Sequence, residues 1–239
     1  MSTNRSTNSM LVRFYDPTIQ ASDPDGRTMS SILALPDREL EYCHDYIQLL
    51  FPLPETSRFH SSAPVIDKAT FTAFRSRPEL RDQLARSLTR MLHFYGFESS
   101  WSQAGSSNLE IVLGENFSRA SKNWIQRFNH NHLRITRIIR SLRVLGLEKH
   151  ATLFHRVLSS VYDNGKSGIG AKSMMFWTRA AERPLYLAPE DERDEGQGED
   201  FLYEYEASKQ AEAYGGNAAA DRNGNGEGGE AAEEKGGSA

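Results

Sequence analysis

Cysteine is almost absent from this chain, which has only Cys43 among its 239 residues. A single cysteine excludes an intramolecular disulfide and a cysteine-rich metal site. The sequence places Cys43 on the apolar face of an expected helix, where it suits a small core residue.

Long apolar runs are also missing. No run approaches the ~18 residues that a membrane-spanning helix needs, and the first residues lack the apolar stretch of a secretory signal. We therefore expect an intracellular protein without a transmembrane segment, whose association with any membrane would be peripheral.

Catalytic and metal-binding motifs are missing as well. The chain has no Gly-x-Ser-x-Gly elbow, and Ser160 stands where a phosphate-binding loop ending in Gly165-Lys166-Ser167 would need glycine. His130 and His132 are two residues apart, which does not match the i, i+4 spacing of helical zinc ligands. The sequence predicts a protein that is not an enzyme and holds neither a metal nor a cofactor.

Charge is divided unevenly along the chain, whose net charge is −4. Residues 1–187 hold 24 basic side chains against 17 acidic ones, whereas residues 188–239 hold 4 against 15. The tail is rich in Glu, Asp, Gly and Ala, and such a composition cannot bury enough apolar surface to offset the entropy of ordering. We expect a disordered terminus at 1–10, a helical domain at 11–187 and a disordered acidic tail at 188–239. Within this tail, the sequence leaves open whether the acidic and aromatic stretch at 201–205 is ordered.

Apolar side chains recur with helical periodicity through the middle of the chain. We therefore predict a mostly all-α fold that forms a single multi-helix domain. Its one expected β element is a very short strand pair near 97–113. The expected helices are residues 37–51, a short helix after Asp67 carrying Phe71 and Phe74, residues 78–95 ending at Gly96, a helix holding Trp124, Ile125 and Phe128, and residues 131–145, 148–162 and 171–181.

Residues 131–148 carry the most information. At about 100° per residue, isoleucine and leucine fall on one third of a helix, and four arginines spread around the other side. Gly146 should end this helix in a left-handed conformation, with Leu147 folding back on the last turn. We expect the apolar side to be sealed in the core and the guanidiniums to point outward. The apolar side comprises Ile135, Ile138, Ile139, Leu142 and Leu145, and the other side Arg134, Arg137, Arg140 and Arg143.

Two alternatives remain open for these arginines. Arginine favours bidentate contacts with carboxylate or phosphate, so an acidic protein or a nucleic acid could bind them. No known nucleic-acid readout module is present, which makes nucleic acid the less favoured partner. The arginines could instead pair with the chain's own acidic residues. The wider basic set adds Arg75, Arg77, Arg81, Arg86 and Arg90.

Four segments follow one another along the chain: LEYCHDYIQLLFPLP at 40–54, SRFHSSAP at 57–64, SLTRMLHFYG at 87–96 and NHLRITRIIRSLRVLGLE at 131–148. Together they resemble the conserved N-terminal region of the opioid growth factor receptor family. The resemblance implies a receptor for an enkephalin-type peptide that acts in growth regulation, located at the nucleus or the nuclear-envelope periphery. The family's Tyr-Ile-Gln-Trp is Tyr46-Ile47-Gln48-Leu49 here, and its Phe-Asn is Phe59-His60.

A zwitterionic peptide with an aromatic head requires a carboxylate for its amine, an arginine for its carboxylate and an apolar pocket. Glu41 or Asp45 is the candidate for the first role, and Arg134 or Arg137 for the second. The remaining binding candidates are the aromatic residues Tyr46, Phe51 and Trp177, together with Gln48, Arg140 and Arg143.

Overall fold

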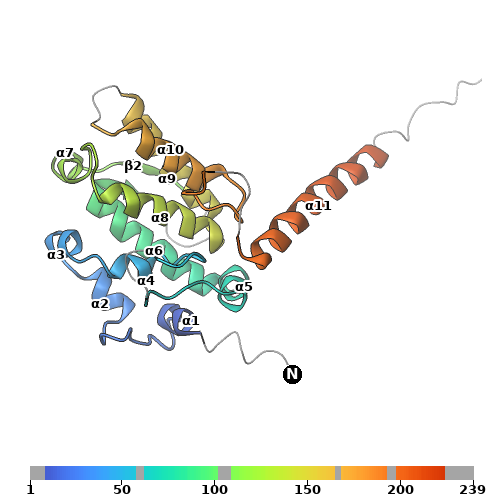
Figure 1. Cartoon of the computed structure of the whole chain (residues 1–239), viewed down its shortest axis with the longest axis horizontal. Helices are drawn as coiled ribbons and strands as arrows, with labels where there is room; N and C mark the ends of the chain where they lie inside the picture. Colours follow the sequence, from blue (N-terminus) through green and yellow to red (C-terminus); the bar gives the residue numbers. More distant parts are fainter. Residues whose placement is uncertain (1–8, 58–61, 102–108, 165–167, 193–197, 224–239) are drawn as a thin grey trace, which may run out of the picture.

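The computed structural model describes residues 9–57, 62–101, 109–164, 168–192 and 198–223, with side chains up to residue 212 (Figure 1). Within these residues the protein is mostly helical, with one two-stranded sheet, as the sequence predicts. The helices are α1 (Met10–Tyr15), α2 (Met29–Leu33), α3 (Asp37–Tyr42), α4 (Tyr46–Leu50), α5 (Lys68–Ser76), α6 (Pro78–Tyr95), α7 (Phe117–Ala120), the 3-10 helix η1 (Ser121–Asn123), α8 (Asn131–Val144), α9 (Glu148–Asp163), α10 (Ala171–Glu182) and α11 (Asp200–Asn223). The strands are β1 (Phe97–Ser99) and β2 (Ile111–Leu113).

Helix α8 lies at the centre of the body and packs against α9 and α10 (Figure 1). Ile135, Ile138, Ile139 and Leu142 on α8 are completely buried, which confirms the predicted apolar face. Helix α6 contributes a second row of buried leucines to the same core. Burial of these large aliphatic side chains is the main stabilising contribution, because each removes apolar surface from water.

Local end signals set several helix boundaries as expected. The Asp67 side chain accepts a hydrogen bond from the Thr70 backbone N–H at 2.7 Å, which caps α5. Pro78 begins α6, and Gly96 ends it with a positive φ of 93°.

Helix α8 ends in the turn that the sequence predicts. Gly146 has a φ of 89°, and the Leu147 N–H donates to the Leu142 carbonyl at 2.7 Å. The Gly146 N–H is directed to the Arg143 carbonyl at 3.4 Å. This pair of bonds is the Schellman arrangement, which satisfies carbonyls at the helix end. Leu147 is buried against the core, as expected.

The helix expected at 37–51 is wrong, because the chain forms two short helices with an extended residue, Cys43, between them. The Arg134 guanidinium donates to the Glu41 carbonyl at 3.3 Å and to the Cys43 carbonyl at 2.7 Å. A continuous helix would have used these carbonyls for its own i→i+4 bonds. A partner some ninety residues away therefore breaks the helix.

The helix expected around Trp124, Ile125 and Phe128 is also wrong. Here α7 and η1 precede an irregular segment in which Phe128 has a positive φ of 60°. The Trp124 indole N–H donates to the Tyr95 carbonyl at 2.9 Å, and the Trp124 carbonyl lies 2.8 Å from His132 Nε2. The bond to His132 satisfies a backbone carbonyl that a helix would otherwise pair internally, and the indole bond ties the Trp124 side chain to the end of α6.

The short strand pair predicted near 97–113 is present. Strands β1 and β2 are antiparallel, with Phe97 opposite Leu113. Residues 102–108 of this stretch lie outside the described residues, as do 165–167 and the family-like positions 58–61.

Part of the tail expected to be disordered forms α11. The helix begins in the acidic and aromatic stretch left open by the sequence, where Phe201 and Leu202 are buried. Figure 1 shows the first turns of α11 next to the body and the rest of the helix leaving it. Residues 1–8 and 224–239 lie outside the described residues, and Met10 already belongs to α1.

Candidate functional site

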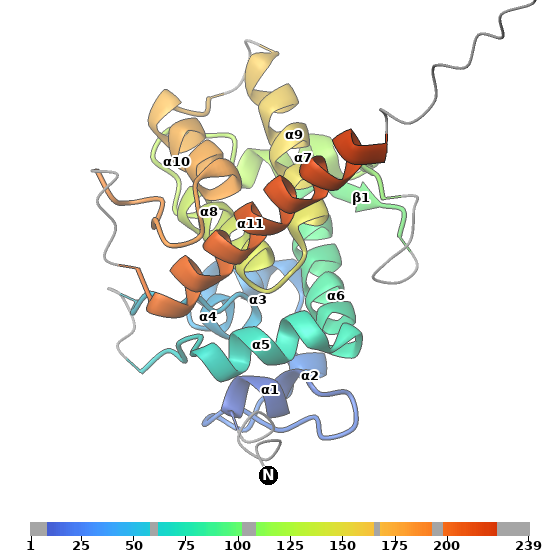
Figure 2. The same ribbon diagram turned by 90° about the vertical axis from the view of Figure 1, so that its right-hand side faces the viewer.

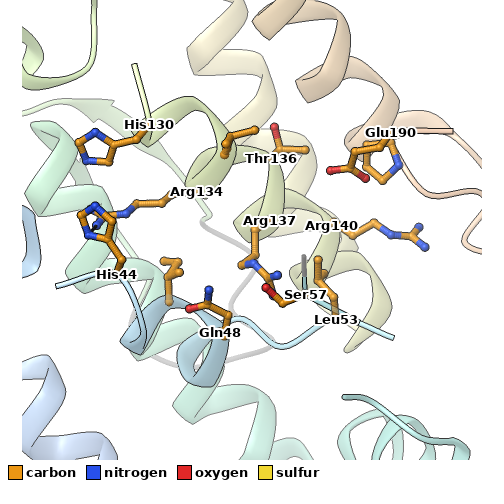
Figure 3. A pocket seen from close by; sticks show the side chains of 13 residues that line it. His44, Gln48, Leu53, Ser57, His130, Arg134, Thr136, Arg137, Arg140 and Glu190 are labelled. Atoms are coloured by element: carbon orange, nitrogen blue, oxygen red, sulfur yellow. Dashed lines mark hydrogen bonds between the residues drawn. The ribbon is translucent and has the colours of Figure 1, made fainter. Parts of the chain in front are cut away.

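A cavity of about 280 Å³ lies along one side of α8. Its walls come from α8, from the chain around α4 and from residues 189–190, which are far apart in the sequence (Figure 3). Four of the predicted binding residues line it, namely Gln48, Arg134, Arg137 and Arg140. The view in Figure 3 places the two histidines at one end, Arg137 in the middle and Glu190 at the other end.

The expectation that the α8 arginines point outward as a fan is wrong. Arg134 is 5% exposed and Arg140 is 1% exposed, whereas Arg137 and Arg143 are half-buried. Their guanidiniums donate mainly to backbone carbonyls of other segments. Helix C-terminal carbonyls lack intrahelical partners and carry partial negative charge, so a guanidinium with five N–H donors suits them.

Arg134 binds the end of α3. Besides its bonds to the Glu41 and Cys43 carbonyls, it donates to the Leu40 carbonyl at 3.0 Å and to Asn131 Oδ1 at 3.1 Å. Its charge is thus surrounded by oriented acceptors, which offsets the cost of burying it.

Arg143 and Arg140 bind the end of α10 and the chain that follows it. Arg143 donates to the Ala180 carbonyl at 3.0 Å and to the Arg183 carbonyl at 2.7 Å. Arg140 donates to the Leu185 carbonyl at 2.7 Å and forms an ion pair with Glu55. Both arginines therefore fix a segment whose continuation forms one wall of the cavity.

The wider basic set behaves similarly. Arg75 donates to the Arg143 and Val144 carbonyls at the end of α8, and Arg81 donates to the Phe74 and Arg75 carbonyls at the end of α5. Arg90 donates to the Leu33 carbonyl at the end of α2 and to the Leu35 carbonyl just after it. Arg77 pairs with Asp16 and Glu79. Most of the guanidiniums that a nucleic acid or an acidic protein could bind are therefore engaged in internal contacts.

Arg137 is the exception on α8. It donates from Nη1 to the Phe51 carbonyl at 3.2 Å and has no ion pair with any described residue. Burial lowers the pKa of Arg137, while the carboxylates of Glu55 and Glu190 oppose this shift. The guanidinium nevertheless stays charged, because arginine titrates far above neutral pH. It is a partly buried cation that lines the cavity (Figure 3), and its Nε and Nη2 groups donate to no described residue.

Two histidines close one end of the cavity. The His44 and His130 rings stack with centroids 5.3 Å apart, and His130 Nε2 lies 3.2 Å from Glu41 Oε1. Burial lowers the pKa of His130, which keeps it largely neutral near pH 7, although the Glu41 carboxylate acts in the opposite direction. Within the described residues, no group of three or more His, Cys, Asp or Glu side chains is placed to hold a metal ion.

The remaining predicted site residues lie outside the cavity. Tyr46, Phe51 and Trp177 are completely buried in the core, and the Trp177 indole donates to the His132 carbonyl at 3.0 Å. Asp45 forms an ion pair with Arg27 at 2.8 Å, which holds the pKa of this carboxyl below its usual range. Nothing in these positions offers an open aromatic pocket.

Several cavity residues were not predicted from the sequence. Ile47, Leu53 and Leu133 supply apolar surface, and Glu190 supplies a carboxylate. The Leu133 side chain is 54% exposed at the rim, on the side of α8 away from the core. Glu190 lies in an acidic segment without periodicity, so no local signal distinguishes it from its acidic neighbours.

The described helices include none that is both long and apolar enough to span a membrane. Comparison with solved structures finds no match to this chain.

Comparison with known sequences gives consistent results. A family model described as the "Opioid growth factor receptor (OGFr) conserved region" matches residues 4–182. The opioid growth factor receptor of Rattus norvegicus is 40% identical over 111 residues, which are 46% of this chain and 18% of the relative. The human receptor is 37% identical over 109 residues, 46% of this chain and 15% of the relative.

A second kind of relative matches over a longer stretch. Opioid growth factor receptor-like protein 1 of Xenopus tropicalis is 32% identical over 148 residues, which are 60% of this chain and 27% of the relative. The chain thus spans less than a third of the length of these relatives. Because the family model covers most of the chain, the protein belongs to the opioid growth factor receptor family.

Proposed function

We propose that this chain is a non-enzymatic receptor domain that binds the carboxylate end of a short, enkephalin-type peptide in the cavity beside α8. The observation that carries the proposal is Arg137, a partly buried cation that faces the cavity and has no ion-pair partner among the described residues. The relatives' name, opioid growth factor receptor, suggests the peptide class and a role in growth regulation.

The chemistry of the cavity suits a peptide carboxylate. Arginine presents parallel N–H donors that match a carboxylate, and such charge-assisted bonds are about twice as strong as neutral ones. Ile47, Leu53 and Leu133 offer apolar surface for the last side chain of the peptide. At about 280 Å³ the cavity is near the lower end of ligand pockets, ~300–1,000 Å³, so it suits one end of a peptide better than a whole pentapeptide.

This proposal replaces two parts of the sequence-based hypothesis. The aromatic trio of Tyr46, Phe51 and Trp177 does not contribute, because these rings are buried in the core. Arg134 is also less suited than Arg137, because its guanidinium is committed to the end of α3.

Calorimetric titration of the full chain tests the proposal. An enkephalin-type pentapeptide with a free C-terminal carboxylate is compared with the same peptide as its C-terminal amide. Loss of the charged bonds to Arg137 should weaken binding at least about tenfold, which corresponds to ~1.4 kcal/mol. Arg137→Gln should weaken binding of the free carboxylate similarly. Equal affinity for both peptides, or no heat with either at millimolar concentration, contradicts the proposal.

Arg86→Gln is the matched control for Arg137→Gln. Arg86 is exposed on α6, lies outside the cavity and contacts Gln83. The control removes the same charge and should leave affinity unchanged. If both variants weaken binding equally, the effect is one of overall charge.

The proposal includes a location, the nucleus or the periphery of the nuclear envelope, which the family resemblance implies. Imaging of the full chain as a fluorescent fusion tests this part. A uniformly cytoplasmic signal contradicts it.

A further inference from the structure

Residues 183–191, here called the strap, follow α10 and lead to one wall of the cavity. Pro189 and Glu190 of the strap line the cavity, and Pro189 is buried. On the α8 side the strap is held by Arg143 at the Arg183 carbonyl and by Arg140 at the Leu185 carbonyl. In both contacts an arginine side chain binds a backbone carbonyl of the strap, so the contacts fix the path of the strap backbone.

Helix α11 holds the strap from the other side. The Leu185 N–H donates to Glu206 Oε1 at 2.9 Å, so both backbone groups of this buried residue are bound by side chains from different helices. The Tyr186 and Tyr203 rings stack with centroids 4.1 Å apart and planes 14° apart. The strap is therefore clamped between α8 and α11.

Helix α11 is itself anchored on α5. Phe201 packs against Phe71 with ring centroids 5.2 Å apart. Arg75 Nη1 donates to Tyr205 Oη at 2.6 Å, and the same guanidinium lies 4.0 Å from the centre of the Tyr205 ring. Figure 2 shows the first turns of α11 beside α5, before the helix crosses in front of the body. Its position on the strap is thus fixed by contacts independent of the strap.

Glu190 occupies the end of the cavity opposite the histidines (Figure 3). No described residue forms an ion pair with it. The two carboxylates expected from the sequence to receive a ligand cation are engaged elsewhere, Glu41 with His130 and Asp45 with Arg27. Glu190 is the acidic side chain that lines the cavity.

We propose that α11 latches the strap and thereby holds Glu190 where it favours peptides with a basic last residue. This inference rests on the proposed function. A peptide carboxylate on Arg137 places the last side chain within the same small cavity, towards either end. A lysine there would meet the Glu190 carboxylate, whereas a second acidic group would be repelled by it.

The first experiment tests the latch without any ligand. Hydrogen–deuterium exchange of the full chain is followed at strap residues 185–191. Glu206→Ala removes the acceptor of the Leu185 N–H, and exchange of the strap should rise at least about threefold, as expected for loss of one hydrogen bond. Glu212→Ala is the matched control, because it removes the same charge from an exposed position on α11. Strap exchange that is equal in wild type and Glu206→Ala overturns the latch.

The second experiment tests selection by Glu190. Two pentapeptides that differ only in the last residue, lysine or methionine, are titrated into the full chain. Because Glu190 is exposed, the wild type should favour lysine by about fivefold at most. Glu190→Gln should abolish the preference, and Glu206→Ala should reduce it. Equal affinities in the wild type, or a preference that survives Glu190→Gln, overturns the selection.

The outcomes separate this inference from the proposed function. If the wild type binds both peptides equally, the selection is wrong while the receptor function stands. If it binds neither, the receptor function fails and the selection with it, and the exchange comparison still decides the latch.

Discussion

Replacing Arg134 with methionine should destabilise the fold by about 3 kcal/mol, although no carboxylate ion pair holds this arginine strongly. Its guanidinium binds three carbonyls at the end of α3. In the variant the Leu40 carbonyl keeps the Tyr46 hydroxyl as a donor at 3.1 Å, whereas the Glu41 and Cys43 carbonyls lose the donor that binds them. Both lost bonds are partly buried, and a carbonyl left without a partner away from water costs ~1–3 kcal/mol.

The expected loss of unfolding free energy lies in the lower half of the ~2–6 kcal/mol that two unpaired carbonyls would cost. Methionine fills much of the space of the arginine stem, and removing the cation relieves the cost of its burial. The glutamate contact contributes little to the estimate, because Arg134 Nη1 lies 4.0 Å from Glu41 Oε2. A lysine at this position keeps the charge but offers a single donor group, so Arg134→Lys should lose an intermediate amount.

Urea denaturation of the full chain measures these differences. The midpoint should fall while the slope stays the same, since the surface exposed on unfolding hardly changes. Arg86→Met on the exposed side of α6 is the control and should stay within ~0.5 kcal/mol of wild type. If Arg134→Met matches this control, the buried arginine does not act as a cap for α3.

Three further predictions concern local features. Gly146→Ala should lower the free energy of unfolding by about 1–2 kcal/mol, because a φ of 89° is unfavourable for a residue with a side chain. Thermal unfolding measures the loss, and an unchanged Tm would contradict the prediction. Asp67→Ala should cost about 1 kcal/mol by removing the cap of α5, and Asp67→Asn, which keeps an acceptor, should recover most of it in the same assay. Burial lowers the pKa of His150 to about 4. The unfolded chain therefore binds the proton first, so stability is full above about pH 6.5 and falls as the pH drops towards 4. His150→Gln should flatten this part of the stability curve, and an identical pH dependence would contradict the assignment.

Most helices could be predicted because their signals lie within the segment itself. The leucine row of α6, its first proline and its terminal glycine are all local, and the structure confirms them. The interrupted helix at 37–51 could not be predicted, because the group that binds its carbonyls is Arg134, on another helix. The helix prediction for the segment after η1 is wrong for the same reason, because Trp124 binds Tyr95 and His132, which lie on other segments.

The candidate site was predictable only in part. Periodicity pointed to the side of α8 that carries Arg134, Arg137 and Arg140, and these residues do line the cavity. It did not reveal which guanidinium keeps free donors, because this depends on where other helices end. Glu190 was not predictable at all, since the strap reaches the cavity through contacts with α8, α10 and α11, which lie on other segments.

The sequence by itself determined which apolar residues of α8 enter the core, because a helix places apolar residues at fixed angles whatever surrounds it. It also determined where α8 ends, because Gly146 accepts a left-handed conformation without a steric cost. Only the tertiary structure decided the fate of the arginines. A guanidinium on a long apolar stem can reach either water or a distant carbonyl, and the ends of α3 and α10 supplied the carbonyls for Arg134 and Arg143.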